Sequence, residues 1–260
     1  MPVIIPLPAF SDNYVWAIRV GGRAAVVDPG DDDPVEAWLA REGVELVAIL
    51  VTHHHPDHTG GVADLARARR IEVCGPAREP IPARTRAVSG GDRIELAALG
   101  LELDVLDVPG HTRGHVAYIG RGAAWGDPAL FCGDTLFAAG CGRLFEGTAD
   151  QMHASLGVLA SLPPATRVYC AHEYTLANLR FAAAVEPGNP ALAARLVREQ
   201  GRRDAGEPTL PSTIGEELAT NPFLRDGEPA VVAAARAHAG RALDGGAEVF
   251  AALRAWTNAF

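Results

Sequence analysis

Short apolar runs alternate with helical patterns along the first two thirds of the chain. Apolar runs bounded by turn residues predict buried β-strands, whereas apolar positions that repeat every three to four residues predict helices. The predicted strands span residues 24–27, 46–51, 71–74, 101–108, 116–119, 129–132 and 167–170. Helices are predicted at residues 33–42, 61–70 and 150–161. This alternation predicts a layered α/β fold.

Several predicted strands end directly in polar or turn residues. These are DPG at 28–30, TH at 52–53, PGH at 109–111, GD at 133–134 and AH at 171–172. Loops at strand ends direct side chains from a rigid sheet, and ligand sites of layered α/β folds gather there. The functional site is therefore predicted at these strand ends.

The strand pattern stops after about residue 173, and helical periodicity takes over. A helix over residues 191–200 is predicted to end at Gly201, and Thr213 with Glu216 forms a capping-box signature for a further helix. One apolar stripe in the last segment contains Val249, Leu253, Trp256 and Phe260. These patterns predict a second region built from helices.

Composition narrows the possible functions. The 260 residues contain 23 basic and 32 acidic side chains, which gives a formal net charge of −9. An acidic chain is a poor general binder of nucleic acid. Every basic residue is arginine. A Schiff-base lysine and a P-loop lysine are therefore excluded, and arginine is the only fixed cation for anionic ligands.

The cysteines and the N-terminal segment indicate a reduced, soluble protein. The four cysteines stand singly, without CxxC spacing, at Cys74, Cys132, Cys141 and Cys170. They predict buried thiols, not a disulfide framework or a thiolate zinc site. The N-terminal run lacks a basic segment and a cleavage site, and no apolar stretch approaches the ~18 residues of a spanning helix. We expect a cytoplasmic protein without membrane association.

The strongest chemical signal follows the predicted strand at 46–51, where the chain reads THHHPDH. A strand that leads into a tight loop can direct His53 and His55 to one cation. Asp57 and His58, at the start of the next helix, then face a neighbouring cation. Imidazole and carboxylate ligands suit zinc, iron or manganese. The motif predicts a metal site.

Three later strand ends supply further ligands: His111, Asp134 and His172. The economical division assigns His53, His55 and His111 to one metal. It assigns Asp57, His58 and His172 to the other, and Asp134 bridges the two. Each ion then keeps room for a shared water or hydroxide. Asp57 and Asp134 are also the predicted catalytic carboxylates.

These residues carry a resemblance to the metallo-β-lactamase superfamily. Within it, the chain resembles glyoxalase II, the hydroxyacylglutathione hydrolases. The similar segments are THHHPDHTGG, PGHTRGH, FCGDTLFAAGCGR, HEYTLANLRFA and PSTIGEELATNPFLR. The resemblance implies an αββα sandwich as catalytic domain over residues 1–172 and an all-helical substrate-binding domain over residues 173–260.

The resemblance also implies the hydrolysis of S-D-lactoylglutathione to D-lactate and glutathione, as in methylglyoxal detoxification. Two divalent ions, zinc in the first place with iron or manganese as alternatives, lower the pKa of a bridging water to form the attacking hydroxide. A thiolate leaving group is only modestly basic, so a strong general acid is less necessary than for an amide. No nucleic-acid partner and no obligate protein partner are expected.

The two carboxylates of glutathione require local cations in an acidic protein. By resemblance Arg143, Tyr174 and Arg254 are the substrate-binding residues. Two positions depart from the family pattern: Phe145 replaces the usual tyrosine, and Thr257 replaces a lysine. These departures remove a hydroxyl group and a charge, so they leave glutathione affinity and the range of acyl and thiol groups open.

Three other classes of protein remain as alternatives. A glutathione persulfide dioxygenase of the same superfamily would hold one iron, but the helical tail argues against it. A metal-dependent nuclease or phosphodiesterase is disfavoured by the net charge of −9. A metal-stabilised protein without catalytic activity would need a site closed to solvent. Metal identity and oligomeric state stay open.

Overall fold

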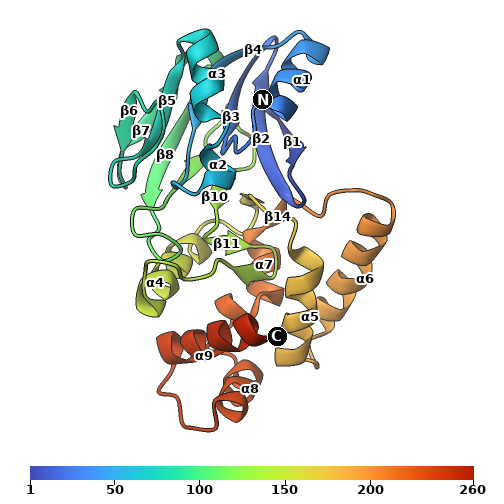
Figure 1. Cartoon of the computed structure of the whole chain (residues 1–260). Coiled ribbons are helices and arrows are strands. Elements are labelled where there is room, and N and C mark those ends of the chain that lie inside the picture. The colour runs from blue at the N-terminus through green and yellow to red at the C-terminus, as the bar shows by residue number, and fades with distance from the viewer. The chain divides into compact units, whose positions relative to one another are not determined.

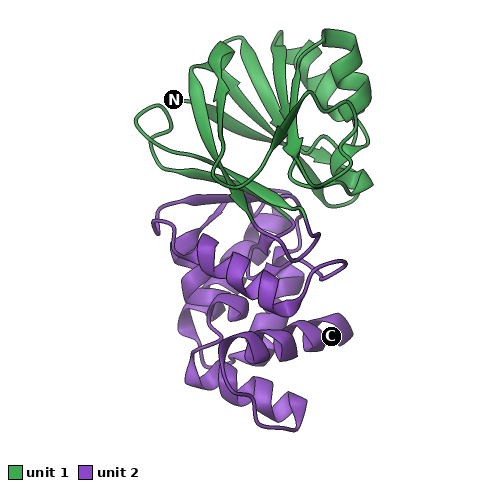
Figure 2. Cartoon of the chain, turned by 90° about the vertical axis from the view of Figure 1, so that its left-hand side faces the viewer, with its two compact units in different colours: residues 1–107, 114–133 green, residues 108–113, 134–260 purple.

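The computed structural model describes residues 1–260. The chain forms two compact units, coloured separately in Figure 2. Unit 1 comprises Met1–Asp107 and Gly114–Gly133, and unit 2 comprises Val108–Arg113 and Asp134–Phe260. The predicted boundary between residues 172 and 173 does not coincide with this division, because residues 134–172 group with the helical region. The assignment of catalytic and substrate-binding domains stays a prediction.

The first sheet of unit 1 is built in strand order β1 to β6. Its strands are β1 (Val3–Ala9), β2 (Asn13–Val20), β3 (Arg23–Val27), β4 (Glu45–Leu50), β5 (Glu72–Pro76) and β6 (Arg86–Val88). The first three strands are antiparallel, and β3 to β6 run parallel. The register pairs Val27 with Leu50, so β3 and β4 end side by side at one edge of the sheet.

Helices α1 (Asp33–Glu42) and α3 (Val62–Arg69) cover one face of this sheet (Figure 1). Ala24 and Val26 of β3 alternate onto that face and pack in one cluster with Trp38 of α1 and Leu65 of α3. The short α2 (Pro56–Thr59) lies between β4 and α3 in the chain. The apolar positions that predicted these helices are thus the ones buried against the sheet.

The second sheet of unit 1 contains β7 (Arg93–Leu96), β8 (Leu101–Asp107), β9 (Val116–Gly120) and β10 (Ala129–Gly133), all antiparallel. A 3-10 turn, η1 (Ala97–Leu99), joins β7 to β8. Buried and more exposed positions alternate along β8, whereas β9 and β10 are buried throughout. The sequences of β9 and β10 are therefore almost continuously apolar.

Unit 2 is mainly helical. Its helices are α4 (Ala149–Ala160), α5 (Thr175–Val185), α6 (Pro190–Asp204), α7 (Ile214–Thr220), α8 (Pro229–Ala239) and α9 (Gly246–Ala259), with the 3-10 turn η2 (Pro222–Leu224). Its short strands pair as β11 (Leu136–Phe137) with β12 (Gly140–Cys141) and as β13 (Arg167–Cys170) with β14 (Ser212–Thr213). No helix in the chain combines the length and apolar character required to cross a bilayer.

Local departures from the predicted elements have physical reasons. Helix α6 continues through Gly201 to Asp204, so the predicted end at Gly201 is wrong. An exposed glycine costs a helix about 1 kcal/mol, which neighbouring turns can offset. The Thr213 cap is confirmed, since its Oγ1 accepts a hydrogen bond from the Glu216 N–H. Val249 and Leu253 are buried as predicted, whereas Phe260 is exposed.

Candidate metal centre

The loop after β4 presents four of the predicted metal ligands. The backbone of His55 is extended, and helix α2 begins at the next residue, Pro56. Proline suits this position because its ring fixes a helical φ and the missing N–H has no partner there in any case. The loop can therefore carry His53 and His55 from the strand side, and Asp57 and His58 from the first turn of the helix.

The ligand atoms of this loop face one another. His53 Nε2 lies 3.1 Å from His55 Nδ1. His58 Nε2 lies 3.4 Å from a carboxylate oxygen of Asp57. Lone pairs at such distances need a proton or a cation between them, because they otherwise repel each other. His53 and His58 are buried, so water cannot screen that repulsion well.

Asp28, at the end of β3, orients this loop. Its carboxylate accepts hydrogen bonds from the backbone N–H and the hydroxyl of Thr52, both at 2.7 Å. Because the Thr52 hydroxyl donates its hydrogen to Asp28, its oxygen can only accept from His53 Nδ1, which lies 3.1 Å away. Asp28 Oδ2 lies 3.1 Å from His58 Nδ1. Both imidazoles thus have Nδ1 facing an oxygen acceptor, which leaves Nε2 available to a metal.

Asp28 was not predicted as a site residue, although the DPG turn at residues 28–30 was recognised as a strand end. The signal that could have found it is the parallel pairing of β3 and β4, which ends the two strands together. Backbone conformation supports the role, because Asp28 has φ of 53°. Aspartate and asparagine tolerate this left-handed region better than most residues.

Replacing Asp28 by asparagine is expected to weaken metal binding about 10- to 100-fold. Asparagine fits the left-handed backbone and keeps one acceptor oxygen, but it removes the charge that faces His58 and that accepts from the Thr52 hydroxyl beside His53. Competition with a chromophoric chelator measures the affinity, and Asp64→Asn on the exposed face of α3 is the control. An affinity within about twofold of the wild-type value would contradict this role.

Close backbone approaches around the loop require glycine. A Cβ on Gly30 would lie 1.9 Å from the Asp57 carbonyl oxygen, and a Cβ on Gly60 would lie 2.4 Å from the Gly30 carbonyl oxygen. Real side chains never occupy such distances, so both positions exclude any larger residue. The turn after β3 and helix α2 therefore pack backbone to backbone. This packing fixes Asp57 close to the Asp28 turn.

Two further histidines of the region have other partners. His54 Nδ1 and the His54 backbone N–H both contact the Glu79 carboxylate, at 3.0 and 2.6 Å. The His115 ring stacks on the His53 ring with centroids 4.6 Å apart. Asn13 donates to the Asp57 carboxylate at 3.1 Å. These contacts orient the loop and do not add ligands to it.

Unit 2 contains the other three predicted ligands as one cluster. Asp134 carries one oxygen 3.4 Å from His111 Nε2 and the other 3.3 Å from His172 Nε2. His111 Nδ1 donates to the Arg143 carbonyl at 2.8 Å, so its Nε2 bears the lone pair. All three side chains are buried. Each of the two clusters thus presents imidazole nitrogens and carboxylate oxygens, a donor set that fits divalent cations.

The residues predicted to bind substrate differ in their surroundings. The Arg143 side chain is exposed and makes no ion pair. Tyr174 is partly exposed, and its ring stacks on His172 with centroids 4.7 Å apart. Arg254 is buried and donates at 2.7 Å to the Cys141 carbonyl oxygen and at 3.1 Å to Asn258. Arg143 and Tyr174 are thus open to a ligand, whereas the hydrogen bonds of Arg254 lie within unit 2.

Phe145 and Thr257, the two positions that depart from the family pattern, also have defined contacts. Phe145 is exposed, and its ring meets the His111 ring edge to face with centroids 5.3 Å apart. Thr257 donates to the Leu253 carbonyl oxygen one turn earlier in α9. Phe145 therefore lies beside a predicted metal ligand, where the missing hydroxyl group changes the polarity of the surface.

The cysteines are all free and buried, as the sequence predicts. Burial raises the pKa of the Cys74 and Cys170 thiols to about 12. Burial also raises the pKa of Cys141, although Arg254 opposes this effect. Such thiols stay protonated and do not serve as nucleophiles. Cys74, Cys141 and Cys170 are therefore not candidates for a nucleophile.

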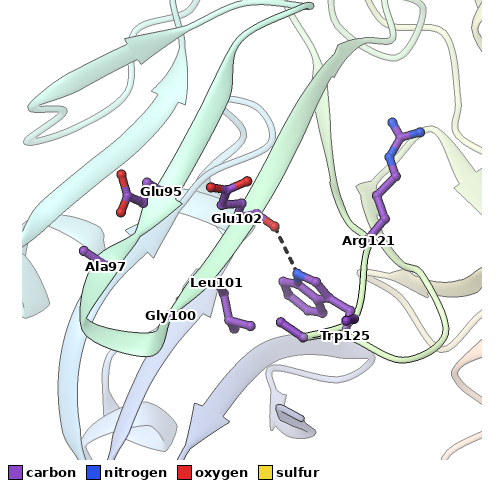
Figure 3. Close-up of a pocket in the computed structure, with 9 residues that line it drawn as sticks. Glu95, Ala97, Gly100, Leu101, Glu102, Arg121 and Trp125 are labelled. Carbon is purple, nitrogen blue, oxygen red and sulfur yellow. Dashed lines mark hydrogen bonds between the residues drawn. The ribbon is translucent and has the colours of Figure 1, made fainter.

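A separate pocket of about 310 Å³ opens in unit 1 beside β7 and β8 (Figure 3). Glu95 and Glu102 lie opposite each other across the two strands, and Trp125 donates to the Glu102 carbonyl oxygen at 3.0 Å. None of the seven predicted metal ligands lines this pocket. It is therefore not the predicted site.

Comparison with known proteins agrees with this architecture. The family model of the metallo-β-lactamase superfamily matches residues 9–172, and the model described as hydroxyacylglutathione hydrolase C-terminus matches residues 173–260. ETHE1 from Myxococcus xanthus has a similar structure, with a TM-score of 0.65, 23% identity, and coverage of 100% of this chain and 99% of that one. At that identity the likeness concerns the fold alone. The predicted fold class, a metallo-β-lactamase fold followed by a helical region, is confirmed.

Two further proteins have higher sequence identity to this chain. The structure of TTHA1623 in a di-iron-bound form has a TM-score of 0.56 and 29% identity, and the match covers 86% of this chain and all of that one. The hydroxyacylglutathione hydrolase of Cupriavidus taiwanensis is 58% identical over 98% of each chain. With this identity along nearly the whole chain and with both family models matched, the chain belongs to the hydroxyacylglutathione hydrolase family of the metallo-β-lactamase superfamily.

Proposed function

We propose that the chain hydrolyses S-D-lactoylglutathione to D-lactate and glutathione. The observation that carries this proposal is the match of the whole chain, the C-terminal helices included, to relatives named hydroxyacylglutathione hydrolase. The superfamily model alone would support only a metal-dependent fold. The helical region adds the part that distinguishes this family from other members of the superfamily.

We further propose that the two clusters together hold two metal ions. One ion would take His53, His55 and His111, the other would take Asp57, His58 and His172, and Asp134 would reach both. Chain continuity supports this division. Gly133, directly before Asp134, lies against Thr52, since a Cβ on Gly133 would be 2.3 Å from the Thr52 hydroxyl oxygen. Gly133 is bonded to Asp134 in the chain, as Thr52 is bonded to His53.

The residues of the chain have defined tasks in this reaction. Bound metal ions would lower the pKa of a water molecule and polarise the thioester carbonyl. Thr52, Asp28 and the Arg143 carbonyl face Nδ1 of His53, His58 and His111 in turn, which leaves each Nε2 for the site. Asp57 and Asp134 supply negative charge that compensates the cations. The departing thiolate is only modestly basic, so the reaction needs a strong general acid less than amide hydrolysis does.

Substrate recognition would use the exposed surface beside His111 and His172. Arg143 has a free guanidinium group that can pair with a glutathione carboxylate, and Tyr174 offers a partly exposed ring. A substrate contact by Arg254 stays a prediction. The helical region over residues 173–260 is proposed as the substrate-binding domain. Zinc is the first proposed metal, with iron or manganese as alternatives, because imidazole and carboxylate ligands suit all three.

The decay of thioester absorbance in the presence of purified protein tests the function. S-D-lactoylglutathione is compared with S-D-lactoyl-coenzyme A, which has the same acyl group but a different thiol. We expect kcat/KM to be at least about tenfold higher for the glutathione thioester. Equal rates would contradict glutathione as the thiol, and no hydrolysis of either thioester would contradict the proposed activity.

A further inference from the structure

The β11–β12 hairpin joins two residues of the site in unit 2. Asp134 lies two residues before β11, and Arg143 lies two residues after β12. Leu136 pairs with Cys141 and Phe137 pairs with Gly140, so the hairpin has only two residues in each strand. Any displacement of this hairpin moves both of its ends.

The hairpin contacts all three predicted ligands of unit 2. Its C-terminal end supplies the Arg143 carbonyl oxygen that accepts from His111 Nδ1. The Phe137 ring meets the His172 ring edge to face with centroids 5.7 Å apart. At its base the Gly142 N–H donates to the Thr135 carbonyl, next to Asp134. The position of the hairpin therefore affects the orientation of the whole cluster.

The hairpin cannot hold this position by itself. A two-stranded hairpin of this length is at best marginally stable in water. Its turn also places Ala139 at φ of 55°, a left-handed conformation that costs a residue with a Cβ roughly 1 kcal/mol or more. Such a conformation persists only when the surrounding structure enforces it. The stabilisation must come from other parts of unit 2.

Side chains from three helices and one helix end hold the hairpin backbone. Asn221 donates at 3.2 Å to the Phe137 carbonyl and at 2.9 Å to the Gly140 carbonyl, and Glu217 of α7 accepts from the Ala139 N–H at 2.7 Å. The remaining bonds run from Asn178 of α5 to the Ala138 carbonyl and from Arg254 of α9 to the Cys141 carbonyl. Four of the hairpin carbonyls and the strained amide thus have side-chain partners.

A buried ion pair fixes these partners in turn. Glu217 and Arg195 are both buried, and Arg195 donates to the Glu217 carboxylate at 2.7 Å. Burial lowers the pKa of Arg195, but the charges of Glu217, Glu216 and Glu199 and the hydrogen bond to Glu217 together outweigh burial and raise the pKa. The second oxygen of Glu217 accepts from the Asn221 amide at 3.0 Å. Through these two hydrogen bonds the Glu217 carboxylate keeps Asn221 in one orientation.

We propose that Asn221 and Glu217 are positioning residues of the hydrolytic site, which act by holding the β11–β12 hairpin behind the cluster of His111, Asp134 and His172. The inference rests on the proposed function for its catalytic consequence. It assigns a second task to the helical region: besides contacting substrate, the helices set the geometry of metal ligands that precede them in the chain.

The test compares two asparagine-to-aspartate variants. Asn221→Asp keeps the acceptor for the Phe223 N–H and replaces the donor by an oxygen that faces two carbonyls and the Glu217 carboxylate. Asn189→Asp is the matched control. Asn189 also begins a helix, and its amide also donates to a carboxylate and a backbone carbonyl, of Glu186 and Ala219, but it does not touch the hairpin.

We expect Asn221→Asp to lower kcat at least about tenfold with KM nearly unchanged, because ligand geometry is disturbed and not substrate binding. Zinc affinity should fall about tenfold, and the Ala139 amide should exchange its hydrogen faster in the metal-free protein. Asn189→Asp should match Asn221→Asp in melting temperature and leave kcat, zinc affinity and the exchange rate of the Ala139 amide at wild-type values. If Asn221→Asp does not fold, Asn178→Ala removes one hairpin bond and is measured in the same way.

The proposal is overturned if Asn221→Asp loses no more kcat than the control, or if hairpin exchange and zinc affinity stay at wild-type values. A uniform rise in KM would also overturn it, since that result assigns Asn221 to substrate binding. If the wild-type protein does not hydrolyse the thioester, the proposed function fails. Zinc affinity and hydrogen exchange then still decide whether the hairpin is held by Asn221.

Discussion

Asp134→Ala is expected to lower kcat for S-D-lactoylglutathione by at least about 10³-fold, which corresponds to roughly 4 kcal/mol of transition-state stabilisation. The carboxylate has oxygens 3.4 and 3.3 Å from Nε2 of His111 and His172, so it reaches both imidazoles. Its removal leaves two buried histidines without the charge that would hold a cation between them.

Kinetics and metal content of the same preparation measure this effect. The variant should contain fewer metal ions per chain, while its circular dichroism spectrum stays that of the wild type. Asp204→Ala, at the exposed end of α6, is the control for the loss of a carboxylate in unit 2. An Asp134→Ala protein that keeps more than about a tenth of wild-type kcat would contradict the assignment of Asp134 as a ligand.

Glu217→Ala is expected to lower the free energy of unfolding by about 3 kcal/mol, because it removes the closer of the two carboxylates that pair with the buried Arg195 guanidinium and leaves only Glu216, at 3.5 Å. It also removes the acceptor of the strained Ala139 amide. For a chain of this size the melting temperature should fall by roughly 10 °C. Thermal and urea unfolding measure both quantities.

A double-variant cycle separates the charge from the other contacts. Glu217→Leu combined with Arg195→Leu removes both charges, so we expect it to be less destabilised than the sum of the two single variants. Additive effects would show that the ion pair is not the source of the loss. A single Glu217→Ala variant destabilised by less than about 1 kcal/mol would contradict the buried pair altogether.

The four ligands proposed for the loop after β4 could be predicted from sequence because their spacing is a local property. His53, His55, Asp57 and His58 lie within six residues of one another and follow an apolar strand. Their convergence is visible in the loop that leads into α2. The C-terminal helices were predictable for the same reason, since apolar periodicity is local too.

The supporting residues could not be found in this way, because their roles arise from contacts that are distant in sequence. Asp28 meets Thr52 only because β3 and β4 pair in parallel. Asn221 meets Gly140 across some eighty residues, and a hydrogen bond between them leaves no pattern in one sequence. The segment 3–9 was not predicted as a strand because Pro6 and Pro8 interrupt it. The structure makes it the edge strand β1, where proline costs no ladder hydrogen bond.

The most direct test of the account removes the metals and returns them in steps. Purified protein is treated with a chelator, dialysed and titrated with zinc, and hydrolysis of S-D-lactoylglutathione is plotted against zinc bound per chain. The account predicts that activity disappears in the metal-free protein and reaches its plateau near two ions per chain. Activity that survives removal of the metal, or a plateau at one ion, would contradict the two-metal thioester hydrolase.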